Sequence, residues 1–330
     1  MKRQFPFQDL ANEYGFTPRY IEKACRISDI LEDMSYVPFL RERLSLYGGT
    51  ALAFIHLQKL ERLSVDIDLN YRHIDTEEDW GDVRDRIDET IKQILYSQGY
   101  TDDDIKISPT YPLCRFTLEY TNHLGSPDDI NIEIGYMRRI PILREDREYN
   151  FHHIGTEKRF KIMTPQKEEL FSNKWCTMLY RGTSRDLFDV YKISQQCFDN
   201  NTFRTTAVID SLMREHPKLT EMNVEDTISQ IPIDTRLRNV LNMKNSYDFD
   251  QIKQQVTEFS TLTVSNINDE EKELIETFYN EYRFEPEKLI NFYILHEDLR
   301  VHPAILRASH QRRSDPSIRS YSDAFTRGTP

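Results

Sequence analysis

Residues 44–71 read LSLYGGTALAFIHLQKLERLSVDIDLNY, which we interpret as a strand, a glycine turn, a helix and a second strand. The mostly apolar run Leu44–Tyr47 predicts a buried strand that ends at Gly48-Gly49. The helix is expected directly after the glycines, from Thr50 to Leu60, and the second strand from Ser64 to Tyr71. The glycines therefore lie between a strand and a helix.

This glycine turn is typical of a phosphate-binding loop. Without side chains, the backbone of Gly48 and Gly49 allows a phosphate to approach closely. The N-terminus of the following helix offers free N–H groups and a partial positive charge to a triphosphate, and Thr50 adds a hydroxyl. We predict that these residues bind the nucleotide, together with Ser64 at the start of the second strand. The alternative is a purely structural turn.

Asp66 and Asp68 are the strongest candidates for chemistry. Residues i and i+2 of a strand point to the same side, with Cα atoms roughly 6–7 Å apart. Two carboxylates held so close repel each other unless a cation lies between them. Such an oxygen-rich site suits Mg²⁺, which also takes phosphate oxygens as ligands. We predict that both residues are catalytic and bind the metal; the alternative is a pair of exposed acids at a strand end.

A third acid is expected for a two-metal site, in which the metals stabilise the attacking and the leaving oxygens. Glu133 is the best candidate metal ligand, because it lies on the polar face of a strand predicted at 130–136 whose other face is isoleucine. An acid within such a strand needs a partner. Glu119, in a strand predicted at 113–120, is the rival, and a solvent-facing acid is the alternative for both.

Candidate cations follow in the second half of the chain. Thr164-Pro165 predicts the start of a helix that runs to Tyr180 and is broken by Gly182. A further helix is expected at 185–197. Lys174 and Arg181 share a face of the first helix, where they can hold a triphosphate. The second helix opens with Arg185, a nucleotide-binding candidate, and Asp186, a catalytic candidate for which a capping role is the alternative.

The 330 residues have room for two domains. We predict an α+β core at 1–163, an α-helical domain at 164–314 and a polar tail at 315–330. Within the core we also expect a helix capped by Thr17, a helix from Thr76 to Ser97, strands at 105–107 and 160–163, and a turn at 126–129.

The composition excludes several classes of protein. A formal charge of −12 argues against non-specific wrapping of nucleic acid. Basic clusters at 138–147, 158–161 and 312–319 can still steer RNA locally, although solvated surface charge is the alternative. The sequence contains no apolar run long enough for a membrane span, and no secretory signal at its start. Four widely spaced cysteines argue against a disulfide framework and favour a cytoplasmic location.

Three segments together resemble the AbiEii/AbiGii toxin family of nucleotidyltransferases, within the DNA polymerase β-like superfamily. These segments are Gly48–Leu52, Arg62–Leu69, and Lys174 with Arg185–Asp189. His302-Pro303-Ala304 also resembles the C-terminal region of that family. The resemblance implies a polymerase β-like core with a mixed sheet, followed by a helical domain. It also implies a requirement for Mg²⁺ and an NTP, and a toxin of a type IV toxin–antitoxin or abortive-infection pair with an antitoxin encoded nearby.

Members of that family are understood to add nucleotides to RNA, with tRNA acceptor ends as a target. By resemblance, Asp66 and Asp68 bind metal, the glycine turn cradles phosphates, Lys174 contacts the nucleotide or assists catalysis, and Asp186 matches a late acidic motif. Two rival functions remain open at this point. One is a nucleotidyltransferase that modifies a protein, and the other is a non-catalytic module that binds a nucleotide or a partner. The intact Asp-x-Asp pair argues against the second.

Overall fold

The protein is described here by a computed structural model that covers residues 3–57, 59–72, 75, 79–156, 158–214 and 217–314. Its centre is a mixed five-stranded sheet in the order β1 (Leu44–Tyr47), β2 (Ile67–Tyr71), β5 (Pro127–Gly135), β4 (Leu113–Thr121) and β3 (Ile105–Ser108). Strands β2 and β5 are parallel, whereas the other neighbours are antiparallel. The expected mixed-sheet α+β fold is confirmed.

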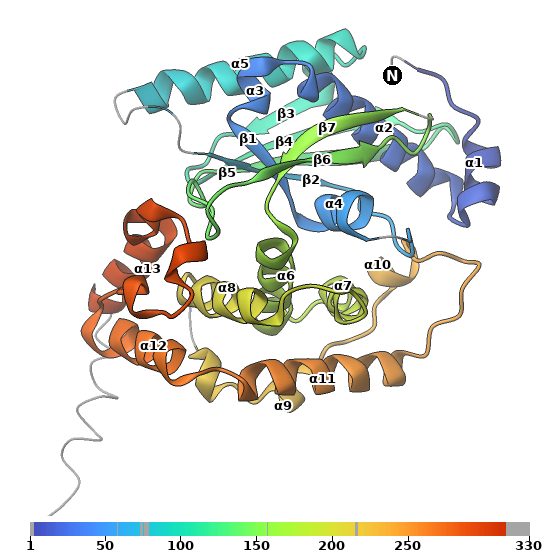
Figure 1. The fold of residues 1–330 in the computed structure, drawn as a ribbon. Helices are drawn as coiled ribbons and strands as arrows, with labels where there is room; N and C mark the ends of the chain where they lie inside the picture. Colours follow the sequence, from blue (N-terminus) through green and yellow to red (C-terminus); the bar gives the residue numbers. More distant parts are fainter. Residues whose placement is uncertain are drawn as a thin grey trace, which may run out of the picture.

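One face of this sheet carries the core. Alternate residues of β5, namely Ile130, Ile132 and Ile134, are fully buried, while the residues between them are at least partly exposed. The apolar face packs with α2 (Pro18–Ser35) and α5 (Trp80–Ser97) in a single hydrophobic cluster. Figure 1 shows α5 on one side of the sheet and the later helices on the other. The polar face of β5 is therefore left for chemistry.

A second, two-stranded sheet was predicted only in part. It consists of β6 (Arg147–His152) and β7 (Arg159–Thr164), which pair antiparallel and pack against β1. We expected a strand near 160–163 but none before it. Strand β6 could not be predicted from the sequence, because Phe151 is its only buried residue and the strand therefore has no recognisable apolar pattern.

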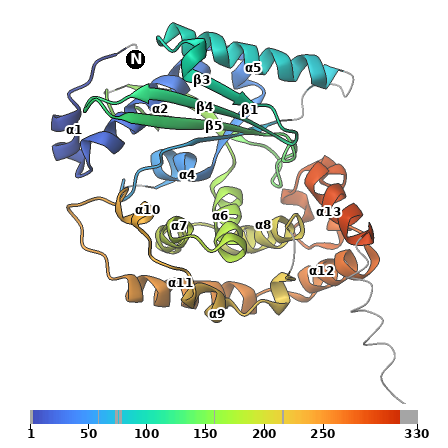
Figure 2. The same ribbon diagram turned by 180° about the vertical axis from the view of Figure 1, so that it is seen from behind.

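The second half of the chain is helical, as expected. Helices α6 (Lys167–Arg181), α7 (Ser184–Ser194) and α8 (Asn200–Leu212) lie beneath the sheet. Three further helices form an outer layer, namely α9 (Val224–Ser229), α11 (Phe249–Ser265) and α12 (Asp269–Glu281) (Figures 1 and 2). The last described helix along the chain is α13 (Pro303–Ser314). Buried Trp175 of α6 donates a hydrogen bond to Ser260 of α11 and so ties the two layers together.

Several boundaries around the glycine turn differ from our expectation. The helix begins at Gly48 as α4 (Gly48–Ala51), continues as the π-helical turn η1 (Leu52–His56), and ends before Leu60. Strand β2 begins at Ile67, three residues later than expected, so Asp66 precedes the strand.

Other boundaries also shift. The turn between β4 and β5 lies at 122–126 rather than 126–129, because Asn122 accepts hydrogen bonds from the backbone of Leu124 and Ser126. Thr164 does not cap α6; its hydroxyl donates to the carbonyl of Leu46. Helix α7 begins after its cap Thr183 and ends at Ser194. The expected cap Thr76 lies outside the described residues.

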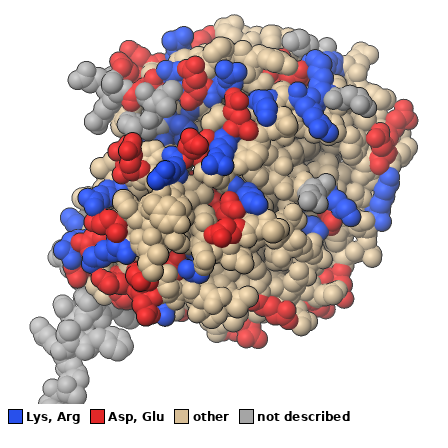
Figure 3. Space-filling view, in the orientation of Figure 1, with Lys and Arg blue, Asp and Glu red and all other residues tan. Residues whose placement is uncertain are grey.

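Two expectations about the surface can be compared with the structure. In the basic clusters, Arg139 and Arg312 are buried and Arg138 is partly buried, whereas Arg319 lies outside the described residues. On the face shown in Figure 3, positive and negative side chains are interspersed. All four cysteines are free, and among the described helices none is long and apolar enough to cross a membrane.

Candidate active site

The glycine turn is built around a carboxylate. Gly48 has a left-handed φ of +70°, and a Cβ at this position would lie 2.7 Å from Cγ of Asp68. Its neighbour Tyr47 is the antiparallel partner of Asp68 in the β1–β2 pair. Glycine is therefore required here by the approach of Asp68, in addition to any need to admit a phosphate.

Gly49 makes room for polar side chains from the segment before β2. A Cβ at Gly49 would lie 2.8 Å from Arg62 Nη2 and 2.9 Å from Ser64 Oγ. The Thr50 hydroxyl is buried and donates to the backbone carbonyl of Asp66 at 2.5 Å. Thr50 thus positions the backbone of Asp66, and its hydroxyl is not free for a phosphate as we had expected.

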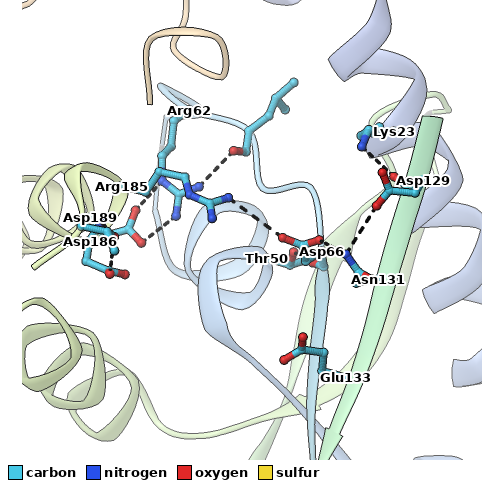
Figure 4. A network of polar contacts seen from close by, with 12 residues as sticks. Lys23, Thr50, Arg62, Asp66, Asp129, Asn131, Glu133, Arg185, Asp186 and Asp189 are labelled. Atoms are coloured by element: carbon cyan, nitrogen blue, oxygen red, sulfur yellow. Dashed lines mark hydrogen bonds and ion pairs between the residues drawn. The ribbon is translucent and has the colours of Figure 1, made fainter. Parts of the chain in front are cut away.

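Asp66 faces the open side of the site. About a third of its side chain is exposed, with Asn131 Nδ2 of β5 at 3.5 Å and Arg185 Nη1 of α7 at 4.0 Å (Figure 4). Because Asp66 precedes the strand, the simple i, i+2 geometry that we expected for Asp66 and Asp68 does not apply. The two acids are brought together by the bend before β2 and by the hydrogen bond from Thr50.

Glu133 lies beside Asp68 on the neighbouring strand. The two residues are register partners in the parallel β2–β5 pair, and Figure 4 shows the Glu133 side chain on β5. Glu133 forms an ion pair with Arg115 of β4 at 2.7 Å. The rival Glu119 is the partner of Asp129 rather than of Glu133, and it pairs with Lys106 on the edge strand. The register therefore favours Glu133 over Glu119 as the third acid.

Asp68 is the acid whose ionisation the site perturbs. Burial raises the pKa of Asp68 to about 6; Lys174 acts in the opposite direction, and the negative charges of Asp66 and Glu133 raise the pKa further. Ionising all three acids together is costly without a compensating cation. The site therefore fits a divalent metal, which would neutralise these charges with oxygen ligands only.

Lys174 is held in place by a buried acid that our sequence analysis did not select. Its Nζ lies 3.0 Å from Oδ2 of Asp189, and Asp189 also accepts from Nε and Nη2 of Arg62 at 2.5 and 2.6 Å. Burial alone would raise the pKa of Asp189, but Arg62 and Lys174 hold it below its usual value. This buried cluster orients Lys174 beside the acids of β2.

Asp186 supports the cations rather than facing the open site. Its side chain is buried in the first turn of α7, where it accepts from Arg181 at 2.7–2.9 Å and from the cap Thr183. Lys174 Nζ lies 4.0 Å away. The capping alternative that we considered for Asp186 describes this geometry better than direct contact with a substrate.

Arg62, Asp189, Arg115 and Asn131 are site residues to which sequence reasoning gave no role, although Arg62 and Asp189 lie within the segments that resemble the family. A weak signal exists for Asp189, which lies three residues after Asp186 and so on the same face of a helix. The partner of Arg62 lies 127 residues away and that of Arg115 lies on the next strand, so no helical or strand periodicity indicates either contact.

A separate group of Asp29, Glu32 and His153 has the spacing to hold a metal ion. Nη1 of Arg3 lies 2.8 Å from Asp29, 2.5 Å from Glu32 and 3.3 Å from His153, so a guanidinium already fills the position between them. Lys158 adds a second cation at 3.2 Å from Glu32. This group is an ion-paired anchor for the N-terminal segment.

The glycine turn opens a helix beside Asp68 and Glu133 on paired strands, with Asp66 just before β2 and buried Lys174 on α6. This arrangement is typical of enzymes that transfer nucleotidyl groups from nucleoside triphosphates. Residues 29–281 match the family model described as nucleotidyl transferase AbiEii toxin, type IV toxin–antitoxin system. The chain belongs to this family and is a nucleotidyltransferase.

One solved structure shares this fold. The chain is similar to MenT4, a nucleotidyltransferase toxin from Mycobacterium tuberculosis H37Rv, with 14% identity and a TM-score of 0.60 over 94% of this chain and 100% of that one. An antigenic nucleotidyltransferase-like protein from Paracoccidioides brasiliensis also matches, with 14% identity and a TM-score of 0.34 over 52% of this chain and 76% of that one. No curated protein sequence matches the chain.

Proposed function

We propose that this toxin transfers a nucleoside monophosphate from an NTP to the 3′ end of an RNA, namely a tRNA acceptor end, in a Mg²⁺-dependent reaction in the cytoplasm. The observation that carries the proposal is the register pairing of Asp68 with Glu133, with Asp66 alongside them. An antitoxin is the expected partner, because the family is that of a type IV toxin–antitoxin system.

The roles follow from the position of each group. Asp66, Asp68 and Glu133 would hold Mg²⁺, which neutralises charge on the phosphates when it is bound. The backbone of Gly48 and Gly49 opens a helix toward the phosphates. The acceptor hydroxyl attacks the α-phosphorus, the bond to the β-phosphate oxygen breaks, and pyrophosphate leaves.

The acceptor proton and the phosphate charge need partners in the protein. Asp66 and Glu133 are both partly exposed, so either can take the proton of the attacking hydroxyl. Lys174, the half-exposed Arg181 and Arg185 lie on the helical side, where they can balance the triphosphate charge. We therefore propose a catalytic region at 1–163 and a helical region at 164–314 that presents the acceptor.

The direct test is transfer of label from each of the four NTPs to total tRNA with Mg²⁺. We expect label on RNA with the wild-type chain, and a loss of several orders of magnitude for Asp68→Asn, which keeps the shape of the side chain. Asp103→Asn, an exposed acid in the turn before β3, is the matched control and should retain full activity.

The other outcomes assign the rival functions. Label on protein but not on RNA would identify a protein-modifying nucleotidyltransferase that uses the same site. NTPs that remain unchanged after long incubation with RNA, protein and Mg²⁺ would contradict catalysis and favour a binding module. Full activity of Asp68→Asn would refute the site.

A further inference from the structure

An aromatic pocket lies behind the active site, at the carboxyl ends of β2 and β5. It has a volume of about 190 Å³, and Tyr71, Trp80, Tyr111, Tyr136, Arg84 and Arg139 contribute to its lining. An apolar cavity of about 150 Å³ is large enough to admit a benzene ring. The pocket therefore has room for a flat aromatic ligand, and nothing in the proposed transfer reaction uses it.

The sheet itself separates this pocket from the catalytic acids. Tyr71 follows Asp68 by three residues in β2, and Tyr136 follows Glu133 by three residues at the end of β5. An odd separation along a strand places side chains on opposite faces, and three residues span about 10 Å. A strand of RNA that leaves the acids over this edge of the sheet would meet the pocket.

The chemistry of the lining favours a nucleobase. Arg139 lies 3.7 Å over the ring of Trp80, and Arg84 lies 5.1 Å over the ring of Tyr136. None of the described residues that line the pocket is acidic, so the two guanidinium groups favour a ligand that carries phosphate. Tyr111 is 56% exposed and offers an open ring for stacking.

One polar group in the lining has no hydrogen-bond partner among the described residues. The side chain of Tyr136 is 4% exposed, and its hydroxyl is buried without a hydrogen bond to that part of the chain. A buried hydroxyl of this kind costs free energy unless a ligand or water satisfies it. A base has donors and acceptors on its edge that can meet such a group, whereas a plain hydrocarbon has none.

We infer that this pocket binds the base of an unpaired nucleotide of the RNA acceptor, with stacking on Tyr111 and Trp80 and phosphate contact from Arg84. The inference rests on the proposed RNA acceptor. The ring of the base stacks on the aromatic side chains, and the edge of the base contacts the Tyr136 hydroxyl. The pocket is too small to hold a complete NTP. It therefore favours RNA with an unpaired end over fully paired RNA.

The test is quenching of tryptophan fluorescence by a single-stranded RNA octamer, a blunt RNA duplex and free nucleoside monophosphates. We expect saturable quenching by the octamer, weaker quenching by the duplex, and loss of the quenching in Trp80→Phe. Tyr111→Ala should weaken octamer binding roughly 5- to 150-fold, which corresponds to about 1–3 kcal/mol of stacking. Tyr293→Ala, at an exposed tyrosine elsewhere, is the control and should bind normally.

Two readouts separate this inference from the proposed function. In the transfer assay, Tyr111→Ala should raise the KM for RNA and leave kcat and the KM for NTP unchanged. A normal octamer affinity and a normal KM in this variant would overturn the pocket assignment while the transfer function stands. Binding of free nucleotides without binding of RNA would overturn the assignment to RNA. Octamer quenching by a chain that transfers nothing to RNA would support the pocket and refute only the proposed function.

Discussion

Replacing Asp189 with asparagine should destabilise the protein strongly, although the side chain keeps its shape. Asp189 is the common partner of Arg62 and Lys174, and all three side chains are at least nine-tenths buried. Breaking a buried ion pair by removing one partner typically costs about 3–5 kcal/mol, because the remaining charge stays buried without compensation.

The loss of unfolding free energy in Asp189→Asn can be converted into an expected decrease in the melting temperature Tm. An unfolding entropy of about 2.1 cal/mol/K per residue gives about 0.7 kcal/mol/K for 330 residues. Asp189→Asn should therefore lower the Tm by about 4–7 °C, measured by thermal denaturation at pH 7. Asp269→Asn, a fully exposed acid in the first turn of α12, is the control and should shift the Tm by less than about 1 °C.

The pH dependence gives a second check on the same residue. The pKa of Asp189 in the folded state lies below its usual value, so its stabilising effect is present above the unfolded pKa of about 3.9 and is lost as the pH falls through the folded pKa. The Tm difference between the wild type and Asp189→Asn should shrink below about pH 4. An unchanged Tm at pH 7 would refute the view that Asp189 compensates both cations.

Three further predictions concern the catalytic edge of the sheet. The folded pKa of Asp68 is raised to about 6, so the wild type should lose stability in chelator as the pH rises from about 4 to 6. Asp68→Asn should escape this loss and melt higher than the wild type at pH 7; equal melting curves would contradict it. Gly48→Ala should lower the stability by about 1–2 kcal/mol and kcat at least about 100-fold, because the new Cβ displaces Asp68. Gly125→Ala, with a similar positive φ but open space, should cost stability alone; if both variants transfer equally, the clash is not the cause. Arg185→Ala should raise the KM for NTP about 10-fold and change the free energy of unfolding by less than about 0.5 kcal/mol, measured by initial rates and denaturant titration; an unchanged KM would remove Arg185 from the nucleotide site.

The strands that carry the site could be predicted because each produces a short, regular pattern of apolar residues in the sequence. The strand before Gly48 and the alternation that exposes Glu133 are confirmed by the structure, and the strand expected from Ser64 to Tyr71 is confirmed from Ile67 onward. Each of these strands is shorter than ten residues and buries apolar side chains, so hydrophobic residues cluster or alternate in the sequence in a way that predicts a strand.

Other parts could not be predicted because their causes are tertiary. The backbone carbonyl of Asp66 accepts a hydrogen bond from the Thr50 hydroxyl, 16 residues earlier, and Asp66 lies outside the strand. The buried pair of Arg62 and Asp189 joins residues 127 positions apart, and no periodicity records such a contact. Strand β6 is held by its partner β7 and contributes only Phe151 to the core.

The distance between Arg62 and Asp189 along the chain also has a consequence during synthesis. The ribosome makes the glycine turn and all three acids before it reaches the helices that carry Lys174 and Asp189. At 5–20 residues per second, the 127 residues that separate Arg62 from its partner take about 6–25 s to translate. For the part of that time that follows Glu133 and precedes Lys174, the growing polypeptide carries all three acids without the lysine. We therefore expect no nucleotidyl transfer by the growing polypeptide until Lys174 and Asp189 have been made.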